Sequence, residues 1–361
     1  MNDYISIPWV NAKEIGALSE PADMHLEYGF KVIRGATSNL SNFQAFSEIE
    51  DCLYSSPSKS QAIYLQDSYV FGCGFLIKSQ EYFIQQSRYL NPDIDARLKN
   101  SLKTAPVELD DKTFWICGCN ASIKNYWHWH AQSLPAILQC IAFLQKLGIS
   151  KYGVIVPKMT SWQRKSLEAL AVDFIDVVEI SIYQTVYVKK LIISELMYST
   201  SPYDASIYRR DVRDRILSSA RENASGISAE KIYISRKDTN KRPMLNEAEL
   251  TSSLNKLGFK EFVMSELSYF DQVLVFNSAE YIVCPHGAGT TNALFCDKQS
   301  KILELHQKSY PNAGPASLLK TNGATYHIDI FEDDGLGQLT NGWYVDVDLC
   351  LDSVQRMVSI K

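Results

Sequence analysis

Short apolar runs along this chain alternate with longer segments in which apolar residues recur every third or fourth position. The runs are typical of buried strands, and the spaced pattern is typical of helices that pack on one side. Strands are expected at residues 62–69, 69–77, 113–117, 152–156, 177–180, 186–193, 231–235, 259–264, 281–284, 301–305 and 326–330, and residues 81–90 fit a strand or a helix. Helices are expected at residues 127–147, 162–170, 203–223, 246–257, 268–277 and 347–360. Strands and helices that alternate at this spacing predict parallel sheets with crossover helices.

Cap and turn residues predict the ends of two of these helices. Gly148 follows the apolar stripe of residues 127–147 and is expected to end that helix, because glycine readily adopts the left-handed conformation found there. Asn246 and Glu249 have the spacing of a capping box at the start of the helix expected at residues 246–257. Gly258 is expected to end it.

The pattern also predicts two domains. Residues 199–230 contain a charged helical segment that separates two α/β blocks, so we expect an N-terminal domain at residues 1–200 and a C-terminal domain at residues 201–344. The helix within residues 345–361 could pack back on the first domain. The first 110 residues have the least regular pattern, and their role stays open.

Composition narrows the class of protein. With 46% hydrophobic and 21% charged residues among 361, the chain fits a soluble globular protein, and a net charge of −5 argues against a broad nucleic-acid surface. Because no basic-then-apolar segment begins the sequence, we expect a cytoplasmic protein, free or at the cytosolic face of the inner membrane. The eight cysteines include no CxxC pair and are expected to be reduced. We expect no cofactor and no required metal, and the oligomeric state stays open.

Residues 278–296 carry the most informative motif. The expected strand 281–284 and Pro285 lead into His286, Gly287, Ala288 and Gly289, followed by Thr290, Thr291 and Asn292 at the start of a helical run. Open backbone amides at a helix start attract anions, most often phosphate, and glycine lets a ligand approach the backbone. His286 can add a donor or a positive charge. The alternative is an ordinary connection between a strand and a helix.

Two further clusters fit the same ligand. Arg236 lies just beyond the expected strand 231–235, and Arg242 follows it, so the two guanidinium groups could neutralise a diphosphate. A solvated basic loop is the alternative. Glu304 is a carboxylate within an apolar strand, which is costly unless the group is bonded. Ribose hydroxyls and an internal pair with Lys or Arg are equally good partners.

Aromatic residues and histidines gather at the start of the helix expected at residues 127–147. The two Trp and two His residues could form a wall for a sugar, and the expected contacts of the sugar or acceptor are Asn125, Trp127, Trp129 and Gln132. His128 or His130 could take a proton from an incoming hydroxyl. A metal site is a weak interpretation, because side chains two residues apart diverge on a helix. A histidine satisfied within the core is the other alternative.

Taken in order, these clusters resemble glycosyltransferase family 61. The similar segments are NYWHWHAQSLPAIL (125–138), YISR (233–236), RPMLNE (242–247), ELSYFDQVLVFNSAE (266–280), IVCPHGAGTTN (282–292) and ILEL (302–305). They cover much of residues 120–305 in the correct order. The bacterial members of the family take part in polysaccharide biosynthesis.

The resemblance implies a GT-B-like α/β fold with two Rossmann-like domains facing a central cleft. It implies inverting transfer from a nucleotide-diphosphate sugar, commonly a UDP sugar, to a saccharide or lipid-linked saccharide acceptor, without an obligatory metal. Arg236 and residues 286–289 would bind the diphosphate, and Glu304 would bind the ribose. The pathway implied is assembly of a bacterial capsule, lipopolysaccharide or exopolysaccharide.

The chain departs from the family at two positions. Gln132 stands where the family commonly has an acidic residue, and Thr290 replaces a common leucine. If that carboxylate is the usual base, His128 or His130 must substitute for it, or activity is impaired. A catalytically impaired carbohydrate- or nucleotide-binding homologue is therefore one alternative. A nicotinamide-dependent oxidoreductase is another, although the glycine loop lacks a third glycine.

Overall fold

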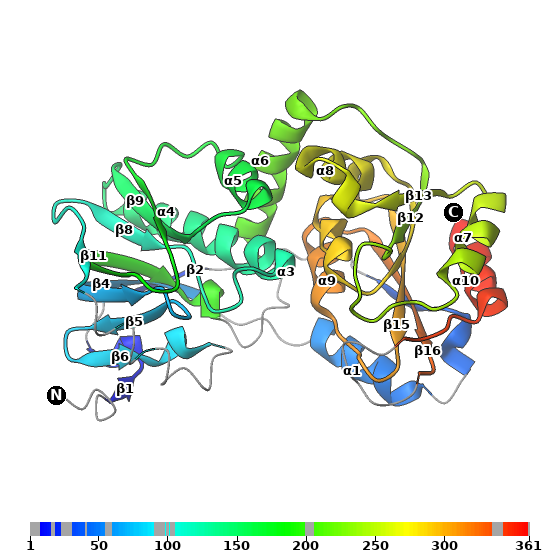
Figure 1. The fold of residues 1–361 in the computed structure, drawn as a ribbon, viewed down its shortest axis with the longest axis horizontal. Helices are drawn as coiled ribbons and strands as arrows, with labels where there is room; N and C mark the ends of the chain where they lie inside the picture. Colours follow the sequence, from blue (N-terminus) through cyan, green and yellow to red (C-terminus); the bar gives the residue numbers. More distant parts are fainter. Residues whose placement is uncertain are drawn as a thin grey trace. The chain divides into compact units, whose positions relative to one another are not determined.

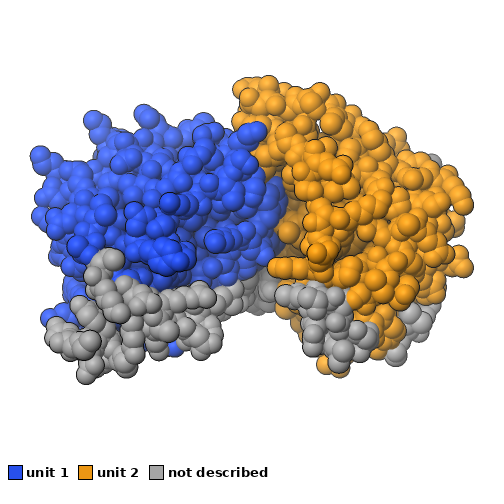
Figure 2. Space-filling view, viewed as in Figure 1, with its two compact units in different colours: residues 1–24, 58–202 blue, residues 25–57, 203–361 orange. Residues whose placement is uncertain are grey.

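The computed structural model describes residues 8–15, 19–22, 31–39, 42–54, 60–89, 98, 101, 105–198, 206–333 and 342–359. The chain forms two compact units, and both take residues from separate parts of the sequence (Figures 1 and 2). Unit 1 comprises residues 1–24 and 58–202, and unit 2 comprises residues 25–57 and 203–361. Residues 25–57 therefore belong to the second unit, which differs from a simple division near residue 200. The expected boundary itself lies outside the described residues.

Unit 2 is built on a six-stranded sheet in which every described pairing is parallel. β14 shows why these residues form such a sheet, since all five of its side chains are buried and helices cover both faces. The strand order is β13-β12-β14-β15-β16-β3. The strands are β3 (Val32–Arg34), β12 (Lys231–Ser235), β13 (Lys260–Val263), β14 (Tyr281–Pro285), β15 (Lys301–Gln307) and β16 (Thr325–Phe331).

The connections of this sheet reverse direction between β12 and β14. The chain leaves β12 through α7 (Glu247–Lys256) to β13 on one side, and then returns through α8 (Tyr269–Ser278) to β14 on the other. α7 contributes Leu250 and Leu254 to one face of the sheet, whereas α8 contributes Val275 to the opposite face. In open α/β sheets, ligands bind beyond the carboxyl ends of the strands at such a switch point. A ligand of unit 2 is therefore expected beside the residues that follow β12 and β14.

Segments from both ends of the chain complete unit 2. β3 pairs with β16 as an edge strand, and α1 (Phe43–Tyr54) packs Phe46 and Ile49 into the core that includes α8. α10 (Val347–Ser359) buries Cys350, Val354 and Met357 in the core that includes α7. The C-terminal helix therefore packs on the second unit rather than back on the first. Its one apolar face matches the open face of the sheet beside α7.

Unit 1 is built on a mixed sheet. Its main path is β1-β6-β5-β4-β11-β8-β9-β10, while β2 pairs with β4 and β7 with β11. β11, β8, β9 and β10 run parallel to one another, whereas β4 and β5 pair antiparallel with their neighbours. The strands are β1 (Trp9–Val10), β2 (Ser19–Ala22), β4 (Ser60–Phe71), β5 (Leu76–Ser79), β6 (Tyr82–Ile84), β7 (Val107–Glu108), β8 (Phe114–Cys117), β9 (Tyr152–Pro157), β10 (Val177–Ile180) and β11 (Thr185–Ser194).

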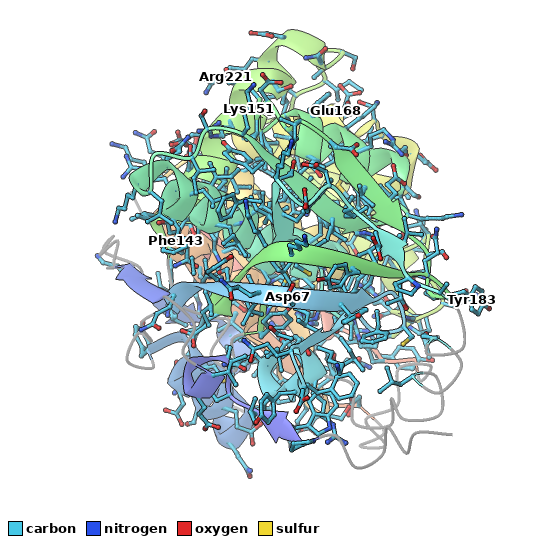
Figure 3. The ribbon with its side chains drawn as sticks, turned by 90° about the vertical axis from the view of Figure 1, so that its left-hand side faces the viewer. Asp67, Phe143, Lys151, Glu168, Tyr183 and Arg221 are labelled. Carbon is cyan, nitrogen blue, oxygen red and sulfur yellow. The ribbon has the colours of Figure 1, made fainter. Side chains whose placement is uncertain are left out.

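Figure 3 views unit 1 from the side and shows β4, which carries Asp67, beside β11. Asp67 accepts a hydrogen bond from the hydroxyl of Tyr187 on β11 at 2.7 Å. Two strands expected at residues 62–77 are instead one long strand, β4, followed by a turn and the short β5. The antiparallel half explains why this part of the sequence lacks the regular alternation of strands and helices. Unit 1 is therefore an α/β unit with a mixed sheet rather than a fully parallel one.

The remaining elements are helical. The expected helices beginning near residues 127, 162, 246, 268 and 347 are confirmed, and a helix is present over the described part of residues 203–223. The capping box expected at Asn246 and Glu249 is wrong, since Asn246 bonds to Val345 instead. The other helical elements are α3 (Tyr126–His128), η5 (Trp129–Ser133), α4 (Leu134–Lys146), α5 (Ser161–Glu168), α6 (Ile207–Asn223), α9 (Gly314–Ser317), η2 (Ala12–Ile15), η3 (Ala36–Asn39), η4 (Gln85–Arg88), η6 (Glu195–Tyr198), η7 (Met264–Glu266), η8 (Ala288–Phe295) and η9 (Leu318–Thr321).

Within the described ranges, we find no helix with the length and apolar character needed to cross a bilayer.

Candidate functional site

Arg236 is the first residue after β12 and lies at the switch point of unit 2. Its guanidinium donates from Nη1 to the carbonyl of His286 at 2.9 Å and from Nη2 to the carbonyl of Lys241 at 2.5 Å. Its backbone amide donates to Glu247 Oε1 at 2.9 Å, so the start of α7 fixes this loop. Both side-chain bonds go to carbonyls and leave the positive charge without a carboxylate at those contacts. The guanidinium is thus held in one place with its charge available to an anion.

Gly287 lies against this guanidinium. A Cβ at residue 287 would overlap Nη1 of Arg236, so the close approach of the arginine requires glycine here. Gly289 is under less constraint, because an added Cβ would meet Ile234 and Met264 at 3.4 Å, an ordinary contact distance. Both glycines were expected to let a ligand approach the backbone. At Gly287, the missing side chain instead leaves space for the guanidinium of Arg236.

Arg242 supplies a second positive charge beside the first. Its guanidinium carbon lies 4.5 Å from the ring centroid of Tyr310, a cation–π contact. Burial, followed by the nearby charge of Arg242, lowers the pKa of Arg236 to about 10, so both arginines are charged at neutral pH. The Nε atoms of both guanidinium groups are buried and have no hydrogen-bond partner among the described residues. Two neighbouring positive charges favour an anionic ligand between or beside them.

The helical run expected after Gly287 is a 3-10 helix, η8. Thr290 donates its backbone amide to the carbonyl of Gly287 at 3.2 Å and its hydroxyl to the carbonyl of Pro285 at 3.2 Å. Asn292 donates its side-chain amide to the carbonyl of Gly289 at 3.2 Å, and Thr291 is fully buried. These bonds tighten the turn, while Ala288 stays exposed at its tip.

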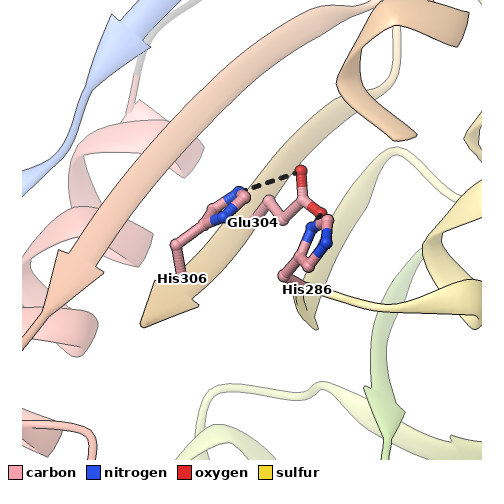
Figure 4. Close-up of side chains that lie close together, drawn as sticks. All are labelled: His286, Glu304 and His306. Carbon is pink, nitrogen blue, oxygen red and sulfur yellow. Dashed lines mark hydrogen bonds and ion pairs between the residues drawn. The ribbon is translucent and has the colours of Figure 1, made fainter. Parts of the chain in front are cut away.

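Glu304 stands at the centre of a buried polar cluster (Figure 4). Its carboxylate lies 2.7 Å from Nδ1 of His286, accepts from the hydroxyl of Tyr326 at 2.8 Å and lies 3.3 Å from Nε2 of His306. Burial alone would raise the pKa of Glu304, but the two histidines hold it well below its usual value. Burial lowers the pKa of His286 to about 4, so its neutral ring donates Nδ1–H to the carboxylate.

The same cluster is the candidate for a metal. Among the described residues, His286, Glu304 and His306 offer ligand atoms that all lie within 4.8 Å of one another. The separation of 2.7 Å between Nδ1 of His286 and Glu304 is that of a hydrogen bond. Tyr326 also donates to the same carboxylate. The two histidines and the carboxylate are ligands that suit a divalent ion. The carboxylate of Glu304, however, already accepts hydrogen bonds from His286 and Tyr326.

The second candidate site lies in unit 1, where the helix expected at residues 127–147 is interrupted. Asn125 caps α3 by accepting the amide of Trp127 at 2.8 Å, and a π-helical turn, η5, then spans Trp129–Ser133. Such wide turns often occur at functional sites. His128 is only partly buried, and its Nδ1 lies 2.7 Å from Oε1 of Gln132. Trp127 is 9% exposed and its ring is 4.9 Å from that of His128.

Two neighbouring residues are core residues instead. His130 is 0% exposed, its Nδ1 lies 2.8 Å from the carbonyl of Tyr126, and its ring stacks on Trp162. Burial lowers the pKa of His130 to about 4. Trp129 is also 0% exposed, and its indole nitrogen donates to Ser166 at 2.7 Å. Neither a base nor a sugar wall fits side chains that have no accessible surface.

The family description Glycosyltransferase 61 matches residues 126–303 of this chain. The match supports the assignment of this chain to glycosyltransferase family 61. A search of curated proteins found no match. The family supports transferase activity on a nucleotide sugar and a saccharide acceptor in general terms. The matched range includes His128, Arg236 and the glycine loop, and it ends one residue before Glu304.

The structure brings the residues suggested by the family-61 resemblance together in two groups. In unit 2, Arg236, Gly287 and Arg242 lie around one edge of the sheet, and in unit 1 His128 lies against Gln132. Burial corrects four expectations. Trp129, His130 and Gln132 have no exposed surface for a sugar or an acceptor, and Glu304 holds His286 instead of offering an accessible oxygen to ribose. The internal partner of Glu304 is histidine and tyrosine rather than lysine or arginine.

Sequence reasoning missed several residues of these groups. His306 and Tyr326 complete the cluster of Glu304, and alternation along β15 could have suggested His306, two residues after Glu304 on the same face. Tyr310 lies against Arg242 and was also missed. Glu247, which ends the segment RPMLNE, was recognised, but not its hydrogen bond to the amide of Arg236. Tyr89 accepts from Gln132, but nothing in the local sequence relates residues 43 positions apart.

Proposed function

We propose that this chain is an inverting glycosyltransferase that moves a sugar from a nucleotide-diphosphate donor, a UDP sugar, to a saccharide acceptor. The family match supports the transferase activity, and the arrangement in unit 2 supports the diphosphate. One observation carries the proposal: Arg236 reaches from the end of β12 to the carbonyl of His286, in space that only a glycine at 287 leaves open. The amides of a tight turn and a fixed guanidinium are thus side by side at the switch point.

On this proposal, Arg236 and Arg242 stabilise the leaving group. As the bond between the anomeric carbon and the diphosphate oxygen breaks, negative charge grows on that oxygen. The two guanidinium groups are already positioned by the carbonyls of His286 and Lys241 and by the ring of Tyr310, so their positive charges are in place before the bond breaks. Fixed charges that meet developing charge lower the barrier without reorganisation. His286 presents a neutral ring held by Glu304 and contacts a hydroxyl of the donor.

On the acceptor side, His128 is the proposed general base. The acceptor hydroxyl attacks the anomeric carbon from the face opposite the diphosphate, and its proton passes to the imidazole. Inversion follows from this single displacement. Among the two histidines of this helix, partial exposure supports His128, and complete burial argues against His130. Trp127 and Asn125 are the proposed contacts of the sugar or acceptor.

We further propose a GT-B-like division of labour, with the donor bound by unit 2 and the base supplied by unit 1. The resemblance of residues 125–305 to the family supports this, as does the doubly wound sheet of unit 2. The proposed acceptor is a saccharide or lipid-linked saccharide of a bacterial capsule, lipopolysaccharide or exopolysaccharide, used at the cytosolic side of the inner membrane.

Calorimetric binding of UDP and release of UDP from a panel of UDP sugars test this function. We expect UDP to bind the unmodified chain and Arg236→Gln to weaken binding about 10- to 100-fold, the effect of losing a charged hydrogen bond. Lys237→Gln is the matched control, because it removes the same charge from an exposed residue that pairs with Glu261. Equal effects of the two variants, or no binding of any nucleotide, would refute the diphosphate site.

Metal dependence is tested in the same assay. Because guanidinium groups neutralise the diphosphate in this proposal, UDP release should persist after treatment with EDTA. Loss of activity that returns with a divalent cation would assign the charge neutralisation to the metal instead. Loss of folding with EDTA, seen as a lower melting temperature, would point to His286, Glu304 and His306 as a structural metal site.

Gln132 favours one competing function, a homologue that binds nucleotide sugars without transfer. An amide replaces the carboxylate that the family commonly has at this position. This alternative predicts UDP binding without release of UDP from any donor and acceptor. It also predicts that His128→Ala changes neither the affinity for UDP nor the amount of UDP released.

A further inference from the structure

We propose that Gln132 is a positioning residue which, fixed by Asn120, holds the proton of His128 on Nδ1 and so makes Nε2 the atom that accepts the proton of the acceptor hydroxyl. This inference rests on the proposed function, because it deepens the role of His128 as the base. The assignment follows from a chain of hydrogen bonds that begins at the backbone. Backbone donors and acceptors have fixed roles, so each side chain in turn has one permitted orientation.

The first step fixes Asn120. Its side-chain oxygen accepts the backbone amide of Ser122 at 2.9 Å, and its side-chain nitrogen donates to the backbone carbonyl of Met197 at 2.7 Å. An amide N–H can only donate and a carbonyl can only accept. In the reverse orientation, the side-chain nitrogen of Asn120 would face the amide N–H of Ser122, and its oxygen would face the carbonyl of Met197. Neither pair could form a hydrogen bond. Asn120 is also fully buried, so water cannot relieve such a mismatch.

The second step fixes Gln132. The side-chain nitrogen of Asn120, already assigned as a donor, lies 3.3 Å from one terminal atom of Gln132, which must then be the oxygen Oε1. The other terminal atom is the nitrogen Nε2, and it donates to the hydroxyl of Tyr89 at 3.2 Å. Gln132 is 0% exposed and lies on the π-helical turn, so the protein alone decides its orientation.

The third step fixes His128. Oε1 of Gln132 can only accept, and it lies 2.7 Å from Nδ1 of His128. Nδ1 must therefore carry a hydrogen, and in the neutral ring Nε2 has none. A nitrogen without hydrogen is the atom that can remove a proton. Since His128 is partly exposed, the ring is accessible to an acceptor, unlike that of His130.

A neutral residue at position 132 has a second consequence. An amide orients the ring as a carboxylate would, but it adds no negative charge to stabilise the imidazolium. Burial lowers the pKa of His128, and the hydrogen bond that its Nδ1–H donates to Gln132 opposes this in part. Tyr89, whose ring centroid is 6.3 Å from that of His128, stays neutral because burial raises its pKa. The base is thus unprotonated down to a lower pH than a histidine paired with a carboxylate.

The surroundings of Gln132 would accept a carboxylate without loss of a hydrogen bond. In Gln132→Glu, Asn120 and His128 would still donate to one oxygen, and the hydroxyl of Tyr89 could turn to donate to the other. The isosteric change Asn120→Asp differs, because an oxygen would replace the nitrogen that faces the carbonyl of Met197. We expect Asn120→Asp to destabilise unit 1 and Gln132→Glu to leave it folded.

The test is nitrogen NMR of the chain labelled with 15N-histidine, in which His128→Asn identifies the signals of His128 among the six histidines. The unmodified chain should show a protonated Nδ1 and an unprotonated Nε2 for neutral His128. Gln132→Leu should lose this preference, and Gln132→Glu should keep it while raising the pKa of His128 by about 1 to 2. A hydrogen on Nε2 in the unmodified chain, or an unchanged pKa in Gln132→Glu, would overturn the proposal.

Enzyme kinetics add a readout that a purely structural role would not change. Gln132→Leu should reduce kcat about 10- to 100-fold, within the usual contribution of acid–base catalysis, with little change in KM for the donor. Gln132→Glu should move the acid limb of the kcat profile to higher pH by the same amount as the pKa of His128. The NMR experiment needs no substrate and therefore tests the tautomer by itself. If the chain showed the expected tautomer of His128 but transferred no sugar, the proposed function would be refuted and the role of Gln132 in fixing the tautomer would stand.

Discussion

Position 287 has room only for glycine, because Nη1 of Arg236 occupies the space that a Cβ atom would need. The guanidinium is held by the carbonyls of His286 and Lys241, and its loop is held by Glu247. Lys241 and Glu247 belong to the connection between β12 and α7, whereas His286 follows β14. At the scale of single residues, the side chains of the candidate diphosphate site therefore hold one another in place. A substitution at Gly287 should act on a ligand through Arg236.

A double-mutant cycle measures this coupling. We expect Gly287→Ala to displace Arg236 and weaken UDP binding about 10-fold or more, as if the charged hydrogen bond were removed. In the Arg236→Ala background the overlap is gone, so Gly287→Ala should have little further effect on the dissociation constant. Calorimetry on the four proteins gives the coupling. Additive losses would show that residue 287 acts on the nucleotide directly.

At the scale of elements, the start of α7 is held by a distant segment. The side-chain nitrogen of Asn246 donates to the carbonyl of Val345 at 2.8 Å, and its oxygen accepts the amide of Val345 at 3.0 Å. The indole nitrogen of Trp343 donates to the carbonyl of Arg242 at 3.1 Å. The segment before α10 therefore fastens both α7 and the loop that carries the two arginines.

Asn246→Asp distinguishes this fastening from an ordinary helix cap. Aspartate caps helices as well as asparagine does, so a capping role predicts little change in stability. The reciprocal pair with Val345 predicts a loss of about 1 to 3 kcal/mol, because an oxygen would face the carbonyl of Val345. Urea unfolding followed by circular dichroism measures the difference. A variant as stable as the unmodified chain would contradict the fastening.

At the scale of the whole molecule, each unit contains a buried histidine that is neutral when folded. His130 in unit 1 and His327 in unit 2 are 0% and 2% exposed. Burial lowers the pKa of each from 6.5 to about 4. The unfolded chain therefore binds more protons than the folded chain between these values. By linkage, stability is complete above pH 6.5 and falls as the solution is acidified toward pH 4.

His327→Leu tests this origin of acid sensitivity. Nε2 of His327 has no hydrogen-bond partner among the described residues, so leucine removes a buried polar group as well as a titrating one. We expect the variant to lose about 1 to 3 kcal/mol less than the unmodified chain when the pH is lowered from 7 to 4.5. Hydrogen exchange at β16 reports this for unit 2. An unchanged pH dependence would exclude His327 as a source.

The sequence by itself determined most of the helices and strands of this protein. Buried parallel strands are continuous apolar runs and packed helices carry a stripe, so local pattern predicts most of unit 2. The places of the glycine loop, Arg236 and His128 in the fold were also predictable, because each stands at the end of a strand or the start of a helix. The mixed half of unit 1 was not, since antiparallel pairing such as that of β4 with β11 depends on residues far apart in the chain.

Only the tertiary structure decided which of the predicted residues are accessible and what each one touches. His128 and His130 are two positions apart and chemically identical, yet a π-helical turn leaves one partly exposed and buries the other. Glu304 faces histidines because β14 and β15 are neighbours, and α10 covers the second unit because its sheet has an open apolar face. Burial and contact arise from packing between distant segments, and local pattern carries no record of which segments will meet.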